Sequence, residues 1–168
     1  MKARVAVLIC VAVILAGAEV YFNLNQKVEI PPISGSLVHD GCDASLWDNV
    51  YKPGRLKVVE KCVAVKGVIE KIRVEKDGDY HILLKLDPAY SHLTNKKNAK
   101  RQKGNLVLEP ICQKRVRQED AKEACAGFNK FMNIPPVGTH VAVVGSYVLD
   151  TPHGWMEIHP VTSITEIE

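Results

Sequence analysis

The stretch Gly138–Ile164, which reads GTHVAVVGSYVLDTPHGWMEIHPVTSI, constrains the fold more than any other part of this 168-residue chain. Its first half alternates large apolar side chains with small or polar ones, at the period of two that β-strands have. Pro152 and Gly154 then supply turn chemistry, because proline fixes φ early in a turn and glycine permits a positive φ late in it. A second strand begins at Trp155. The pattern predicts a β-hairpin that closes a small barrel.

The second strand of this hairpin has two unlike faces. Met156 and Ile158 lie on one face by alternation, and Trp155, Glu157 and His159 lie on the other. Strand packing alone does not require an aromatic ring, a carboxylate and an imidazole on one face. We therefore expect the second face to form a ligand-facing surface.

The first 18 residues have the three-part pattern of a secretory signal peptide. A basic start is followed by the apolar run Val5–Leu15 and by the small residues Ala16, Gly17 and Ala18. Residues 1–18 are therefore predicted to be removed, which gives a secreted or extracytoplasmic protein without a stable membrane span. The alternative is that the same segment stays as an N-terminal membrane anchor.

Removal of this segment changes the charge and the cysteine count. It takes away two of the 22 basic residues and leaves 19 acidic ones, so the net charge falls from +3 to +1 and favours no class of partner. Four cysteines remain, and an even count in an exported chain predicts two disulfides. Three pairings are possible from sequence, and the one we test joins Cys42 to Cys62 and Cys112 to Cys125. The absence of a C-x-x-C pair weakens a zinc-site interpretation.

The rest of the chain predicts an irregular extension (residues 19–54) followed by one barrel domain (residues 55–168). The domain is predicted to begin with a long strand over Arg55–Glu75 bent at Gly67, a tight turn over Lys76–Asp79 and a strand over Tyr80–Leu86. A loop over Ala89–Gly104 and a third strand over Asn105–Ile111 are predicted to follow. A helix over Val116–Met132 and the final hairpin are predicted to complete the domain. This β-β-β-α-β-β order, with one helix between strands three and four, is that of a mainly-β, five-stranded, OB-like Greek-key barrel. A five-stranded sandwich with one helix is the alternative.

Several of these segments carry a resemblance to known proteins. RLKVVEKCVAVKGVIEKI, DGDYHILLKLD, GNLVLEPIC and above all VLDTPHGWMEIHPVTSI resemble an uncharacterised family of short exported microbial proteins with the closing motif D-x-x-H-G-W-x-E-I-H-P-V. The resemblance covers about Arg55 to Thr165. It implies export and an OB-like barrel, and it supplies no catalytic residues.

Two candidate ligand sites follow from the histidines and acids. Asp77, Asp79 and His81 could form an acidic metal pocket, although Asp-Gly is also what a tight hairpin turn demands. Glu157 and His159, with His81 or His153, could bind zinc or another divalent ion as two imidazoles and one carboxylate. Trp155 could instead stack on a sugar or a base, and the third interpretation is a purely structural cluster.

A basic set surrounds the predicted third strand. It comprises Lys96, Lys97, Lys100, Arg101, Lys103, Lys114, Arg115 and Arg117, and only Glu109 opposes it. Such a set could bind nucleic acid, an anionic glycan or an acidic cell-surface component, or it could simply keep a loop solvated.

We therefore expect an exported, disulfide-stapled OB-like binding module whose ligand is a polyanion. The alternative is a metal-dependent, nuclease-like hydrolase that uses the C-terminal hairpin, and the third hypothesis is a scaffold without a small ligand. The sequence contains no catalytic triad elbow, phosphate loop or dinucleotide fingerprint, and no catalytic residue or cofactor is assigned.

Overall fold

The computed structural model describes residues 30–31 and 40–168. The predicted signal peptide, residues 1–18, and most of the predicted extension lie outside the described residues. Within the part of the chain that is described, no helix has the length and apolar content needed to cross a membrane.

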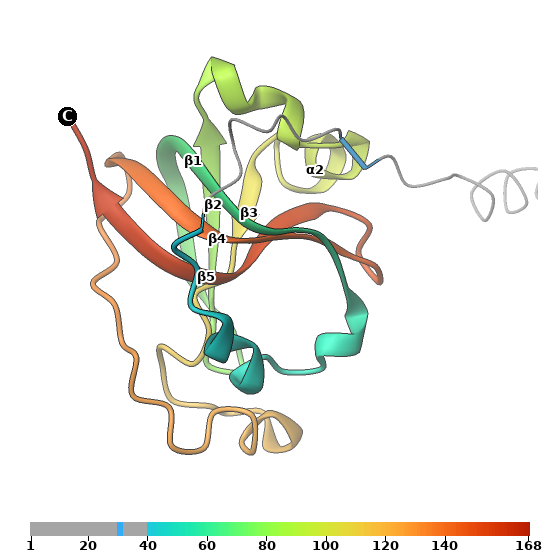
Figure 1. The fold of residues 1–168 in the computed structure, drawn as a ribbon, viewed down its shortest axis with the longest axis vertical. Coiled ribbons are helices and arrows are strands. Elements are labelled where there is room, and N and C mark those ends of the chain that lie inside the picture. The colour runs from blue at the N-terminus through green and yellow to red at the C-terminus, as the bar shows by residue number, and fades with distance from the viewer. Residues whose placement is uncertain (1–29, 32–39) are drawn as a thin grey trace, which may run out of the picture.

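The protein is mainly β, and its five strands form one mixed sheet that closes on itself in a ring (Figure 1). The strands are β1 (Leu56–Val74), β2 (Tyr80–Leu86), β3 (Leu106–Leu108), β4 (His140–Asp150) and β5 (Met156–Glu166). Their order around the ring is β1-β2-β3-β5-β4, and β4 pairs with β1 to close it. All the pairings are antiparallel except β3 with β5, which is parallel.

Strand β1 is long enough to pair with both of its neighbours. Its first part pairs with β4 and its last part with β2, and Gly67 takes part in both pairings. A Cβ on Gly67 would lie 2.3 Å from the carbonyl oxygen of Lys85, so no side chain fits where the two neighbours converge. The register with β2 shifts between Ile69 and Lys71. The strand is therefore irregular, but its register shift with β2 lies after Gly67, and the glycine is needed for close approach of Lys85.

Both predicted hairpins are present. β1 and β2 are joined by residues 75–79, which we call the first turn, and Gly78 there has φ +96°. β4 and β5 are joined by residues 151–155, which we call the second turn, and Gly154 there has φ +78°. Only glycine adopts such values readily, so the two glycines set the shape of the turns.

The prediction of a helix over Val116–Met132 is wrong. This segment contains only the short 3-10 helix η5 (Glu119–Ala121), followed by turns in which Gly127 has φ +74°. An amphipathic helix needs a surface on which to bury its apolar face, and Phe131 in the predicted stripe is 67% exposed. Other members of the stripe are packed without forming a helix, since Ala121 is fully buried and Phe128 lies against the smaller core cluster.

Helical structure instead occurs where the sequence predicted a loop, between β2 and β3. η4 (Pro88–Leu93) is followed by α2 (Lys96–Arg101), whose first turn is held by Asn95 and Asn98 in a reciprocal capping box. Figure 1 shows α2 at one end of the ring and the long connection between β3 and β4 at the other. Before β1 lie η2 (Ala44–Asn49) and η3 (Pro53–Arg55).

Two disulfides form with the tested pairing. Cys42 is bonded to Cys62 and ties the end of the extension to β1, and Cys112 is bonded to Cys125 and ties the segment after β3 to the β3–β4 connection. Disulfides persist in oxidising compartments, so both bonds are consistent with an extracytoplasmic location. The inside of the ring is filled by aliphatic side chains from all five strands, together with the fully buried Tyr147.

Candidate functional site

A pocket of about 400 Å³ opens between the first turn and the second turn. It is lined by both turns, by the two ends of β1 and by residues beside β2 and β3. The lining residues are Tyr51, Arg55, Arg73, Glu75, Lys76, Asp77, His81, Glu109, Gln118, Asp150, His153 and Trp155. Of the five predicted ligand-binding residues, His81, His153 and Trp155 line this pocket.

The β1–β2 ladder places three of these side chains together. Arg73 and His81 are directly opposite each other in the register, so their side chains share one face of the sheet. Glu75 lies two residues after Arg73 on the same face, and its carboxylate pairs with Arg73 at 3.1 Å. This arginine and glutamate pair therefore lines the pocket.

Glu109 lies at the junction of β3 and β5. Its backbone N–H donates to the carbonyl of Ile158 at 3.0 Å, and its carbonyl accepts from the N–H of Val161 at 3.3 Å. These bonds continue the parallel pairing beyond the end of β3, and they hold the Glu109 side chain at the pocket floor, where the residue is only 7% exposed.

The second turn forms an aromatic wall. The imidazole of His153 stacks on the indole of Trp155, with ring centroids 4.2 Å apart and planes 3° from parallel. The indole Nε1 donates to Glu157 Oε2 at 3.0 Å, and His153 Nδ1 contacts Asp150 Oδ2 at 2.9 Å. The His153 side chain is 53% exposed, so its imidazole forms the outer layer of the stack.

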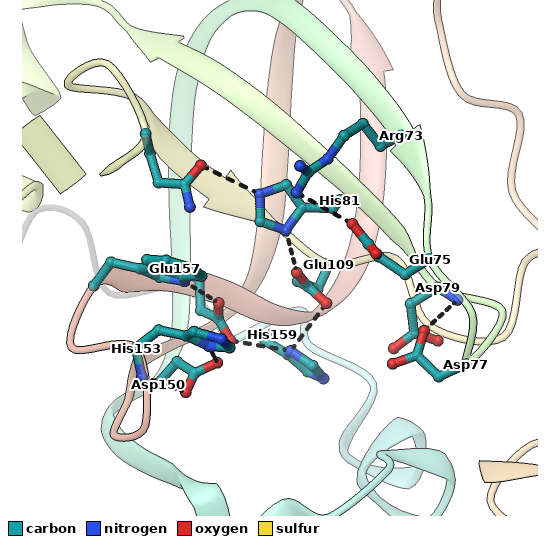
Figure 2. A network of polar contacts seen from close by, with 12 residues as sticks. Arg73, Glu75, Asp77, Asp79, His81, Glu109, Asp150, His153, Glu157 and His159 are labelled. Atoms are coloured by element: carbon teal, nitrogen blue, oxygen red, sulfur yellow. Dashed lines mark hydrogen bonds and ion pairs between the residues drawn. The ribbon is translucent and has the colours of Figure 1, made fainter. Parts of the chain in front are cut away.

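Behind the wall lies a buried acid–histidine network made of His81, Glu109, Glu157 and His159 (Figure 2). His81 Nδ1 is 2.8 Å from Glu109 Oε1, and His159 Nδ1 is 3.1 Å from Glu157 Oε1 and 3.8 Å from Glu109 Oε2. Glu157 and His159 are 1% and 0% exposed. The expectation that these two side chains form the ligand-facing surface is therefore wrong, because Glu109 and the second turn cover them.

The charges within this network follow from burial and contact. Burial raises the pKa of Glu109 well above its ordinary range, and the nearby Glu157 charge raises it further. Burial would also raise the pKa of Glu157, but the hydrogen bond and charge of His159, with Arg55, outweigh it and lower that pKa. The same contact raises the pKa of His159 against the effect of burial. These shifts favour the ionised form of Glu157, the charged form of His159 and the protonated form of Glu109.

Two further groups have a shifted pKa, namely His81 in the pocket lining and the buried Asp79 of the first turn. Burial, followed by the charge of Arg73, lowers the pKa of His81, so this imidazole is neutral near pH 7. Burial, followed by the charge of Asp77, raises the pKa of Asp79 to about 7, and its carboxylate accepts a 2.7 Å hydrogen bond from the backbone N–H of Cys112. Perturbed groups gathered at one pocket are typical of functional sites.

The geometry gives little support to a metal centre. Among the described residues, the group of potential ligands that lie within 4.8 Å of one another is Asp79 with Cys112 and Cys125, and both cysteines are bonded in a disulfide. His81 contacts Glu109 and Glu157 contacts His159, so these predicted ligands are engaged with other side chains rather than grouped around a common point for an ion. Asp77 accepts a hydrogen bond from the N–H of Asp79, as a residue of a tight turn does.

The basic residues fall into two clusters at opposite sides of the pocket. The first cluster, on α2 and its C-terminal end, is Lys96, Lys97, Lys100, Arg101 and Lys103. It adjoins the second turn, because Asn95 of its cap donates to the carbonyl of Gly154 at 3.0 Å. The second cluster is Lys114, Arg115 and Arg117, and it adjoins the first turn through backbone bonds from Lys114 to Gly78 and from Arg117 to Lys76.

No family model, curated protein or solved structure matches the chain. The resemblance to a family of exported proteins therefore stays a prediction, and the site is assigned from its own geometry.

Sequence reasoning did not select Arg55, Arg73, Glu109 and Asp150 as site residues. The sequence contains a feature that could have indicated two of them, Arg73 and Glu109. Arg73 and His81 stand symmetrically about the first turn, and Glu109 is the one acid between the two basic clusters. Arg55 and Asp150 come together only because β1 pairs with β4.

Proposed function

We propose that the protein is an exported, disulfide-stapled OB-like binding module whose ligand is an anionic polymer that lies across the pocket. The order β1-β2-β3-β5-β4, the parallel pairing of β3 with β5 and the shared long β1 support an OB-like barrel. One departure is the position of α2, which lies between β2 and β3 and not between the third and fourth strands. Disulfides and the expected signal peptide support a secreted or extracytoplasmic location, with an N-terminal anchor as the alternative.

The location of the pocket supports a binding role. OB-folds bind oligonucleotides and oligosaccharides on the face of strands two and three, between the turn that joins strands one and two and the turn that joins strands four and five. The pocket occupies this face, with one wall from each turn.

The observation that carries the proposal is the arrangement of positive charge. One basic cluster adjoins each of the two turns, so a chain that crosses the pocket from one turn to the other meets cations on both sides. Lys96, Lys100, Arg101, Lys103, Lys114, Arg115 and Arg117 are exposed. None of these residues lines the pocket itself, so contact with both clusters requires a ligand that extends beyond the pocket, as a polymer does.

The metal-dependent hydrolase is a weaker candidate. The pairing of Arg73 with Glu75 in the pocket wall favours it. Of the predicted ligands, however, Glu157 and His159 bond to each other, and His81 and His159 face different oxygens of Glu109. A scaffold role does not explain why residues with shifted pKa values lie at the pocket.

Salt dependence tests the proposal. Retention on heparin and on single-stranded DNA should fall steeply as salt rises, because bound lysines and arginines release counterions. Replacing Lys96, Lys97, Lys100 and Arg101 with glutamine should reduce the slope of log K against log salt by roughly 0.7 to 0.9 for each lost contact.

A matched control removes the same charge elsewhere. Lys57, Lys61, Lys66 and Lys71 are exposed on β1 and do not line the pocket. Glutamine at these four positions should leave the slope close to that of the wild type. Equal losses in the two quadruple variants, or retention no stronger than that of an unrelated protein of equal charge, would contradict the proposal.

A further inference from the structure

We propose that the pocket cleaves glycosidic bonds in an anionic glycan, with Glu109 donating a proton to the glycosidic oxygen and Asp150 accepting a proton from the attacking water. This inference rests on the proposed function, because the glycan is the polymer held by the two basic clusters.

The pocket walls favour a glycan over a nucleic acid. Four carboxyl groups line it, those of Glu75, Asp77, Glu109 and Asp150. Carboxyl oxygens accept hydrogen bonds from sugar hydroxyls, which a glycan offers in greater number than a nucleic acid, while Arg55, Arg73 and Lys76 in the same lining balance the negative charge. The stacked rings of His153 and Trp155 give the pocket a flat wall for the apolar face of a sugar. The acidic groups of the glycan then reach the basic clusters outside the pocket.

Glu109 has the placement and the protonation of a general acid. It lines the pocket and is 7% exposed, and its Oε1 is fixed by His81 Nδ1 at 2.8 Å. Burial and the charge of Glu157 raise its pKa, which favours the protonated form that a general acid needs. Enzymes that hydrolyse glycosides pair one carboxyl kept protonated by its surroundings with one ionised carboxylate. His81 is a positioning residue in this scheme.

Asp150 supplies the second carboxyl of the pair. It lies at the end of β4, and its Oδ2 contacts both the guanidinium of Arg55 and Nδ1 of His153. Its side chain is 2% exposed although it lines the pocket, so these two contacts fix the direction of the carboxylate. Such a fixed, ion-paired carboxylate can orient a water and accept its proton.

The reaction balances without another reactant. The bond between the anomeric carbon and the glycosidic oxygen breaks, and the leaving oxygen takes the proton of Glu109. Water attacks the anomeric carbon, and its proton passes to Asp150. Exchange with solvent then returns Glu109 to its protonated form and Asp150 to its ionised form, and each turnover yields one new reducing end.

The test incubates the full mature protein with hyaluronan, polygalacturonate and heparin, and with single-stranded DNA for comparison, and measures new reducing ends. We expect reducing ends from at least one of the three glycans and no shortening of the DNA. Glu109→Gln should lower the rate by about 10²- to 10⁴-fold, the usual contribution of a general acid, while retention on the same glycan persists. Glu123→Gln, at an exposed position outside the pocket, should cleave like the wild type.

A second measurement needs no variant. In wild-type protein labelled with ¹³C at glutamate carboxyls, one resonance should titrate well above the ordinary range of glutamate, and cleavage should decline with rising pH over the same interval. That resonance should belong to Glu109.

Each contrary result would contradict a different part of the proposals. A glycan that is retained but yields no reducing ends overturns this inference and leaves the proposed function standing. Failure to retain any of the three glycans or DNA overturns both. Cleavage that survives Glu109→Gln, or cleavage of DNA alone, shows that the chemistry assigned to the pocket is wrong.

Discussion

Replacing Asp79 with asparagine should make the protein less sensitive to pH. Asp79 is 2% exposed, and its Oδ1 accepts from the N–H of Cys112 at 2.7 Å. Asparagine has nearly the same shape and keeps an oxygen for this hydrogen bond, so the substitution removes the charge without removing the contact.

The size of the effect follows from the pKa of Asp79. Burial, followed by the charge of Asp77, raises the folded pKa from 3.8 to about 7. Because the folded carboxyl holds its proton more tightly than the unfolded one, the free energy of unfolding is highest below about pH 4 and falls until about pH 7. A difference of about three pH units corresponds to ~4 kcal/mol. Asp79→Asn should lack this loss, and should therefore be more stable than the wild type by up to ~4 kcal/mol at pH 8.

Urea unfolding of both proteins at steps from pH 4 to pH 8 measures the difference. Other buried groups titrate in both proteins, and the charge of Asp79 acts on Glu109 and His159, so the difference reports Asp79 together with this coupling. The two free energies of unfolding should be similar near pH 4 and diverge as pH rises. A difference that does not change with pH would refute the reasoning, and so would a variant that is less stable at pH 8.

Three further predictions concern the framework. Gly145→Ala should lower the free energy of unfolding by about 1–3 kcal/mol, since the new Cβ would lie 2.4 Å from Ile158 Cγ2; an unchanged urea midpoint would contradict this close packing. Tyr147→Phe should cost about 1–3 kcal/mol in the same assay, because it leaves the buried carbonyl of Leu93 without its 2.7 Å donor. Mass spectrometry after alkylation without reduction should find no free thiols in the mature protein, and alkylated cysteines would contradict both disulfides. Replacing Cys112 with serine removes its disulfide and should lower the free energy of unfolding by about 3 kcal/mol.

The strands could be predicted because their signals are local. Alternation along the chain and the glycine-containing turns predict β1, β2, β4 and β5. Gly67 marks the close approach of β2 and not the position of the register shift. The failed helix over Val116–Met132 shows the limit of a local signal. Its apolar spacing is helical, but only the rest of the fold decides whether a surface exists to bury that stripe.

The site was predicted in part for the same reason. Alternation correctly placed Trp155, Glu157 and His159 together, and the structure confirms that Glu157 bonds to both of the others. Alternation does not reveal that Glu109, distant in sequence, lies against this face and buries it. The position of Glu109 at the pocket floor depends on the pairing of β3 with β5, which a local pattern does not reveal.

Mapping the ligand contact by NMR tests the central claim most directly. The claim is that an anionic polymer lies across the pocket between the first and second turns. Backbone amide shifts of ¹⁵N-labelled protein titrated with a short heparin oligosaccharide should change in both turns, on α2 and at Lys114–Arg117. Changes confined to the groove formed by Met132–Pro136 and Thr162–Glu166, away from both turns, would contradict the account.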